Sequence, residues 1–469
     1  IVLRIVNIEV STILTLNAIS PLEASGAPVF NNNPYLRLNG RGVLVGIIDT
    51  GIDYLNKEFQ REDDTTRIVR IWDQTIQGNK EIYSLKYGTE YTEDQINQAI
   101  RLQASGGDPY SIVPSKDDIG HGTRMAGIIG GRGINPDLKG AASDCQFIIV
   151  KLSRATKVEL DVAVIDKTDV PSYSPWSALL ALRYIIAVAR ELKRPVVVFE
   201  PLGSNMGSHT GNGIVEQSIN NYSTQSGTVV VVPTGNQGNT DTHTEGIIEN
   251  VGDVKDIEIR IGEKQRNLPI EIWINKPNRV KLSIISPSGE MIDNLDSKNA
   301  NNERIKFLYE GTEMIVNFTS PELSTGDSHI FIRAYNLKAG IWKFRLTGQY
   351  IVEGKYYAWI PQRELLDSET KFLNSVGYTT LTLSSTSNRA ISVAYYNQED
   401  NSVVTESGRG YTRDKMIKPD IAAGGFNAIV TNPGGGTAVI SGASVAWAVV
   451  AGCCVLILQW AVPDKNYPD

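Results

Sequence analysis

The sequence predicts an α/β fold built on a mostly parallel sheet, with an antiparallel β domain inserted into it. Short apolar runs alternate with helical stretches before residue 250 and again after residue 366. Such runs are typical of strands buried on both faces, and strands that alternate with helices indicate a parallel sheet. The region between them consists of short segments in which polar and apolar residues alternate, which favours antiparallel strands.

The strands and helices of the α/β part follow one another along the chain. We expect strands at GVLVGIID (42–49), FIIVKL (147–152), VVVF (196–199) and TVVVVP (228–233), and helices at 177–193 and about 213–226. The same pattern resumes late in the chain with RAISVAYY and KPDIAA. The α/β domain is therefore expected to be interrupted and then completed.

The inserted domain covers about residues 250–365. Its segments, such as LPIEIWIN, RVKLSIISP and HIFIRAYN, are separated by Gly, Pro, Asn and Asp. That pattern is typical of an antiparallel β-sandwich or jelly roll. The expected division of the chain is an N-terminal junction at 1–30, a first α/β part at 31–249, the β domain at 250–365 and a second α/β part at 366–469. Apolar and polar residues alternate over residues 1–20, as is typical of a β-strand.

Composition narrows the classes of function. The formal net charge is −7 and no long basic tract is present. Binding to nucleic acid or to an anionic membrane surface requires clustered Lys and Arg, so we expect neither partner. Three cysteines (Cys145, Cys453 and Cys454) allow at most one ordinary bridge, and none has zinc-ligand spacing with a histidine. We expect them to be small buried apolar residues.

The apolar stretch at 444–462 has two interpretations. It carries no Asp, Glu, Lys or Arg and is long enough to span a bilayer. The alternative is a helix buried in the core of the α/β domain. Gln459, the Ser/Gly-rich segment before the stretch and the parallel-sheet context favour the core helix.

Candidate catalytic residues are few, because the chain has only four histidines. His121 lies between two glycines, whereas His209 and His243 are expected to be loop residues. Asp49 is the last residue of the strand VLVGIID, at the sheet edge where the functional groups of α/β proteins gather. Ser444 begins the long apolar helix, whose N-terminus favours developing negative charge.

Asn236 follows another buried strand, and its amide could donate a hydrogen bond to an oxyanion. Together with Asp49, His121 and Ser444 it would supply what serine hydrolysis needs: a hydroxyl, a base, a carboxylate and an oxyanion donor. Each residue also has an ordinary explanation, as a turn Asp, a loop His, a helix-capping Ser and a turn Asn.

The order Asp, His, Asn, Ser and the motifs around these residues resemble the subtilisin-like (subtilase) family, peptidase family S8. The matching segments are GIIDTGID (46–53), GHGTRMAG (120–127), PLGSNMGSHTG (201–211), VPTGNQGN (232–239), KPDIAA (418–423) and SGASVAWAVVAG (441–452). The inserted β domain is similar to that of the clostridial Csp germination proteases, in which a jelly roll interrupts the catalytic domain.

The resemblance implies a three-layer subtilisin-like fold and a serine endopeptidase that hydrolyses polypeptides through an acyl-enzyme. By position, Asp49 would orient His121, His121 would be the general base and Ser444 the nucleophile. Asn236 and the backbone N–H of Ser444 would form the oxyanion hole.

The resemblance also implies substrate-binding residues and partners. The backbone at Leu202 and Gly203 would pair with an extended substrate, and Gly235 would lie near the pocket for the side chain that precedes the cut. Residues 1–30 would be the end of a pro-segment. No cofactor is required; calcium occurs in the family, but no acidic cluster here has a diagnostic spacing. An extracellular or spore-associated location is implied.

Several positions depart from the family pattern. Ala443 stands where Thr usually precedes the nucleophile, and Trp447 stands where a small residue is usual. An alternative is therefore a catalytically impaired pseudoprotease that binds and signals in spore germination. Both chain ends look cut, so the last helix is also expected to lack covering partners and to expose an apolar patch.

Overall fold

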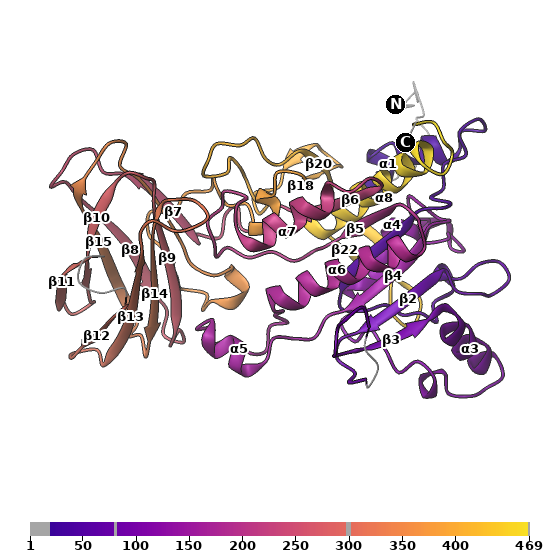
Figure 1. Ribbon diagram of the computed structural model, residues 1–469, viewed down its shortest axis with the longest axis horizontal. Coiled ribbons are helices and arrows are strands. Elements are labelled where there is room, and N and C mark those ends of the chain that lie inside the picture. Colours follow the sequence, from indigo (N-terminus) through magenta and orange to yellow (C-terminus); the bar gives the residue numbers. More distant parts are fainter. Residues whose placement is uncertain (1–18, 79–81, 297–301, 468–469) are drawn as a thin grey trace, which may run out of the picture.

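The computed structural model describes residues 19–78, 82–296 and 302–467. Figure 1 shows two parts side by side: an α/β part around a large sheet, and an antiparallel β part. Most of the strand expected at residues 1–20 lies outside the described residues. The first described elements are the short helices α1 (Pro21–Ala24) and α2 (Ala27–Asn31).

The large sheet has nine strands, most of them parallel, as predicted. Its strands are β1 (Leu44–Asp49), β2 (Ile68–Asp73), β3 (Thr89–Thr92), β4 (Gln146–Lys151), β5 (Val196–Phe199), β6 (Thr228–Pro233), β18 (Ile391–Asn397), β19 (Ser402–Val403) and β20 (Ile421–Gly424). The order is β19-β18-β6-β5-β1-β4-β2-β3, and β20 also pairs with β18. Strands β5, β1 and β4 lie at its centre and are parallel, so their carboxyl ends share one edge.

Helices cover both faces of this sheet, which gives the three layers. On one face α4 (His121–Gly130) and α8 (Ala443–Ala461) share a core with alternate residues of β1 and β5. On the other face α6 (Pro175–Glu191) and α7 (Ile214–Ser223) pack on the remaining residues of these strands. This division follows from the alternation of side chains along a strand.

The remaining elements of the α/β part are α3 (Glu93–Ala104), α5 (Lys157–Val162), the hairpin strands β21 (Ala428–Thr431) and β22 (Thr437–Ile440), and the 3₁₀ turns η1 (Lys57–Phe59), η2 (Pro109–Ser111), η3 (Pro136–Leu138) and η5 (Leu383–Thr386). A further 3₁₀ turn, η4 (Arg363–Leu365), lies between the last two strands of the β part.

Helix α8 is buried in the core, although among the described helices it alone is long and apolar enough to span a membrane. Trp447 is buried in this core, and its Nε1 donates a hydrogen bond to the carbonyl of Val393 at 2.8 Å. Gln459 is 1% exposed, and its Oε1 accepts from the backbone N–H groups of Asn39 at 2.8 Å and Gly40 at 2.7 Å. The polar residue in this apolar helix thus supplies a hydrogen-bond acceptor for two backbone N–H groups of the loop before β1.

The β part consists of two antiparallel sheets, in the orders β11-β10-β15-β8-β17 and β12-β13-β14-β9-β16-β7. The strands are β7 (His243–Ile247), β8 (Val254–Ile261), β9 (Leu268–Ile274), β10 (Arg279–Ile285), β11 (Met291–Leu295), β12 (Asn302–Phe307), β13 (Thr312–Thr319), β14 (Ser328–Tyr335), β15 (Gly340–Tyr350), β16 (Lys355–Trp359) and β17 (Lys371–Phe372). Residues of both sheets form one apolar cluster, which is consistent with an inserted β domain.

Three histidines lie near the junction of the two parts, and we call His209, His243 and His329 the junction histidines; His209 and His243 are buried and His329 is partly buried. His209 and His243 stack on the ring of Trp359, with centroids at 4.1 and 4.4 Å. His329 stacks on Trp273 at 4.0 Å. The prediction that His243 is a loop residue was wrong, because it begins β7; His209 lies between elements but is buried.

Arg413 reaches this aromatic cluster from the second α/β part. Its guanidinium lies 5.0 Å from the ring centroids of both Trp273 and Tyr357. It also pairs with Asp327 of the β part at 2.7 Å, and the Arg413 side chain is 1% exposed. A buried ion pair of this kind fixes how the two parts meet.

Candidate active site

Asp49 and His121 form a hydrogen-bonded pair at the carboxyl edge of the large sheet. Asp49 ends β1 and is 3% exposed, whereas His121 is the first residue of α4. Nδ1 of His121 lies 2.9 and 2.8 Å from the two carboxylate oxygens of Asp49. A Cβ at Gly122 would lie 2.2 Å from the Gly51 carbonyl, so only glycine lets α4 approach β1 this closely.

The pair changes the acid–base behaviour of His121. Burial alone would lower the pKa of the imidazole, but the charge and hydrogen bond of Asp49 outweigh burial, so the pKa of His121 is raised above its usual 6.5. About a third of the His121 side chain remains exposed (34%). The ring is therefore oriented on one side by Asp49 and open on the other.

Asp117 supports this arrangement and was missed in the sequence. Its Oδ1 accepts from the Gly120 N–H and the Thr50 hydroxyl at 2.7 Å each, and its Oδ2 accepts from the N–H of Thr123 at 2.8 Å. One carboxylate thus caps the first turn of α4 and ties it to the residue after Asp49. The signal was the acidic residue four positions before His121.

Ser444 is the second residue of α8 and is half-buried. Within the described residues its hydroxyl makes no hydrogen bond, so the structure joins Asp49 to His121 but not His121 to Ser444. Ala443 before it is completely buried. The hairpin β21–β22 precedes Ser444 and reaches toward the Asp49 loop.

The tip of this hairpin is fixed beside α4. Asn432 Oδ1 accepts from Nε and Nη2 of Arg124 at 3.0 and 2.8 Å. The N–H of Gly434 donates to Asp53 Oδ2 at 2.9 Å. These contacts join the segment before Ser444 to the segments that carry Asp49 and His121.

The other expected site residues lie at the ends of neighbouring strands. Leu202 and Gly203 follow β5, and Gly235 and Asn236 follow β6. The Asn236 side chain is exposed and makes no hydrogen bond within the described residues. Gly203 and Gly235 both pack against Thr382, whose Cγ2 would lie 2.6 and 2.3 Å from a Cβ at these positions.

Two backbone acceptors at the end of β5 already have internal partners. The Leu202 carbonyl accepts from the hydroxyl of Ser384 at 3.0 Å, and the Gly203 carbonyl accepts from the side-chain amide of Gln362. Thr382, Ser384 and Gln362 were not found from the sequence, since nothing local marks them. Gln362 comes from the loop between β16 and β17 of the β part, whereas Thr382 and Ser384 lie after β17, where the chain has returned to the sheet edge.

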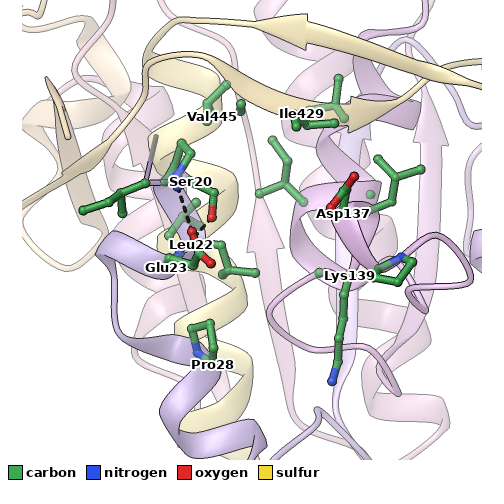
Figure 2. A pocket seen from close by; sticks show the side chains of 18 of the residues that line it. Ser20, Leu22, Glu23, Pro28, Asp137, Lys139, Ile429 and Val445 are labelled. Carbon is green, nitrogen blue, oxygen red and sulfur yellow. Dashed lines mark hydrogen bonds between the residues drawn. The ribbon is translucent and has the colours of Figure 1, made fainter. Parts of the chain in front are cut away.

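Two cavities lie on opposite sides of the large sheet. Figure 2 shows one of about 430 Å³, with Leu22 and Glu23 of α1 on one side, Val445 and Ile429 above, and Lys139 opposite. It lies on the α8 face and includes neither Asp49 nor His121. The other, of about 560 Å³, is lined by Leu202 and Gly203 and lies between α5, α6 and the β part.

Among the described residues, no group of three or more His, Cys, Asp or Glu side chains is placed to hold a metal ion. Cys145, Cys453 and Cys454 are unpaired; Cys145 and Cys454 are buried and Cys453 is half-buried. Burial raises the pKa of Cys145 to about 12, so this thiol stays protonated.

The fold and the Asp–His pair define a subtilisin-like α/β protein. The subtilase family model matches residues 40–258 and 372–467, more than half of the chain. The chain therefore belongs to the subtilase family, a family of serine peptidases. The match is interrupted over most of the β part.

Individual relatives agree with this assignment. The structure of the Clostridium perfringens CspB protease superimposes with a TM-score of 0.82 at 28% identity, covering 95% of this chain and 87% of that one. The PI-type proteinase of Lactococcus lactis subsp. cremoris is 24% identical over 245 residues, which are 49% of this chain and 11% of the proteinase. The PII-type proteinase of Lacticaseibacillus paracasei is 23% identical, with the same shares. The chain thus spans only 11% of the length of these curated relatives.

Proposed function

We propose that this chain is a serine endopeptidase that cleaves polypeptides through an acyl-enzyme at Ser444. The observation that carries the proposal is the Asp49–His121 pair, with Nδ1 2.8 Å from the carboxylate at the end of β1. Membership of the subtilase family supports a polypeptide substrate. The start of α8 supplies the remaining group that the chemistry needs.

In the proposed mechanism Nε2 of His121 accepts the proton of the Ser444 hydroxyl as Oγ attacks the scissile carbonyl. Asp49 holds the Nδ1–H tautomer and stabilises the imidazolium that forms. His121 then donates its proton to the leaving amine. In the second half of the reaction His121 accepts a proton from the water that attacks the acyl-enzyme and returns it to Oγ of Ser444. No metal or organic cofactor takes part in these steps.

The oxyanion would be bound by the side-chain amide of Asn236 and the backbone N–H of Ser444. The exposed Asn236 amide has no other partner within the described residues, so it is free to donate to a substrate oxygen. The N-terminus of α8 adds a favourable field for the negative charge. Leu202 and Gly203 would pair with the extended substrate, Gly235 would border the pocket for the side chain before the cut, and residues 1–30 would be the end of a pro-segment.

A second candidate is a pseudoprotease that binds polypeptides without cutting them. Two observations favour it: the Ser444 hydroxyl makes no hydrogen bond to His121, and Gln362 occupies the Gly203 carbonyl that a substrate strand would use. Loose catalytic hydrogen bonds are common in substrate-free enzymes and tighten when substrate binds. The endopeptidase is therefore the stronger proposal.

Hydrolysis of an unfolded protein substrate separates the two candidates. Wild type should produce new N-termini detectable by mass spectrometry, and Ser444→Ala should lose about 10⁴-fold or more in rate. Ser441→Ala is the matched control, since this exposed serine lies in the same segment. A folded wild-type protein that produces no cleavage would favour the pseudoprotease.

A further inference from the structure

The groove beside Leu202 and Gly203 is bounded by elements of both parts of the molecule. Its volume of about 560 Å³ lies in the range of ligand sites. α5 and the first turns of α6 and α7 form one side, and residues of β9 and β14 form another. In Figure 1, α5 stands between α6 and these two strands.

The charged side chains that line this groove all have one sign. Its acidic residues are Glu159, Glu200, Glu271 and Glu364. No Lys, Arg or His is among the described residues that line it. At the rim, Lys167 Nζ donates to the main-chain oxygen of Glu364 at 3.1 Å rather than to a carboxylate.

Three of the four carboxylates already have partners. The Glu159 carboxylate accepts from the backbone N–H and the hydroxyl of Thr156, at the cap of its own helix. Glu271 accepts from the N–H of Gly207 at 2.7 Å, and Glu364 accepts from the Gln237 amide at 3.1 Å. Glu200 differs, because neither of its carboxylate oxygens accepts a hydrogen bond within the described residues. Its side chain is buried at 4% exposure, and Oε2 is closed off from solvent.

The position of Glu200 after β5 directs its side chain to the groove. Val197 and Phe199 face the α4 and α8 core, whereas Val196 and Val198 face α6. Because side chains alternate along a strand, Glu200 continues the face of Val196 and Val198. The groove opens on that same face, at the first turns of α6 and α7.

The rest of the lining is mostly apolar. Leu160, Ala178, Val215 and Phe331 stand around the space that Glu200 borders. A Lys or Arg side chain combines an apolar stem with a charged head, so it matches apolar walls that end at a carboxylate. A neutral apolar side chain would fill the same walls but leave Glu200 without a partner.

We propose that this groove binds a lysine or arginine side chain of the polypeptide substrate, with Glu200 as its anionic partner. The proposal rests on the endopeptidase function proposed above and names a substrate class for it. The β part then has a direct role in recognition, because Phe331 and Glu271 complete the groove.

The acid–base state of Glu200 agrees with this role. Burial raises the pKa of Glu200 to about 7, and no neighbouring charge contributes to the shift. An arriving cation would favour the ionised carboxylate and lower that pKa. The cation would thus meet a charged partner that is only 4% exposed to solvent.

Peptide binding tests the proposal independently of catalysis. In the Ser444→Ala protein, octapeptides that differ only by lysine or norleucine at one position are compared by fluorescence anisotropy, position by position. We expect one position at which lysine binds about ten- to a hundredfold more tightly than norleucine, the range for a hydrogen bond to a charged group. Adding Glu200→Gln should abolish that preference, and Glu263→Gln, an exposed acid outside the groove, should leave it unchanged.

Equal affinity for lysine and norleucine at every position would overturn the proposal, as would a lysine preference that survives Glu200→Gln. Glu200→Met is the second variant. Because Glu200 has no hydrogen-bond partner, both variants should melt at or above the parent temperature, and a clear drop would reveal a structural role instead. Failure of the endopeptidase proposal has a different signature, which is lysine-selective binding without hydrolysis by the Ser444-containing protein.

Discussion

Replacing Arg413 by alanine should strongly destabilise the junction between the α/β and β parts. The Arg413 guanidinium pairs with Asp327 at 2.7 Å and donates to the carbonyl of Ser208 at 3.0 Å. It also lies 5.0 Å from the rings of Trp273 and Tyr357. Arginine at this position therefore connects the second α/β part both to the β part and to the segment after β5.

The magnitude follows from burial. The Arg413 side chain is 1% exposed and that of Asp327 is 10% exposed. Removing one partner of such a pair leaves a charge without compensation, which typically costs about 3–5 kcal/mol. Replacing both partners at once costs less, so Arg413→Met combined with Asp327→Asn should be milder than the sum of the two single variants.

The free energy of unfolding of these variants can be measured by urea unfolding followed by tryptophan fluorescence, because Trp273 lies against the Arg413 guanidinium. The exposed pair Lys157–Asp161 offers a control, and Lys157→Ala should change the free energy of unfolding by less than about 0.5 kcal/mol. A loss below about 1 kcal/mol for Arg413→Ala, or strict additivity in the double variant, would refute this reasoning.

Three further predictions concern pH and the core. Peptidase activity should rise with pH through an inflection above 6.5, because His121 must be neutral to accept a proton and Asp49 raises the pKa of His121. In a pH–rate profile, Asp49→Asn should move the inflection of the residual activity to lower pH. Burial lowers the pKa of all three junction histidines but raises the pKa of Glu200 and Glu216 to about 7. Below pH 6.5 the histidines therefore favour proton binding by the unfolded chain, whereas the two glutamates favour proton binding by the folded chain. In a variant that combines Glu200→Gln with Glu216→Gln, the free energy of unfolding should fall more steeply between pH 7.5 and 5.5 than in wild type; urea midpoints test this, and the same pH dependence in both proteins would contradict it. Gln459→Leu should lower the free energy of unfolding by about 2–4 kcal/mol, because the backbone N–H groups of Asn39 and Gly40 lose their acceptor. A melting temperature equal to that of wild type would show that these N–H groups find other partners.

The order of strands and helices in the α/β part could be predicted from the sequence, because each strand there has a distinctive local pattern of residues. VLVGIID has an unbroken apolar run and ends at Asp49, so its burial and its position at the sheet edge could both be inferred. The glycines on both sides of His121 were likewise visible in the sequence, and the 2.2 Å clearance at Gly122 shows why α4 needs one of them to approach β1. These features depend on neighbours in sequence.

The features that were missed depend on long-range contacts. Gln362 reaches the end of β5 from the loop between β16 and β17, and Thr382 reaches it only because the chain returns to the large sheet after β17. His243 lies in the polar segment HTEGI and has no strand pattern, yet stacking on Trp359 and a bond to the Ala358 carbonyl bury it in β7. Such partners cannot be inferred from local periodicity.

The central claim is that Ser444 is a nucleophile activated by His121. A fluorophosphonate probe tests it most directly, with the modified residue located by tandem mass spectrometry. The account predicts a single adduct on Ser444 that disappears in His121→Ala and persists in Ser441→Ala. A cooperatively folded wild-type protein that acquires no adduct, or an adduct that forms equally without His121, would contradict the account.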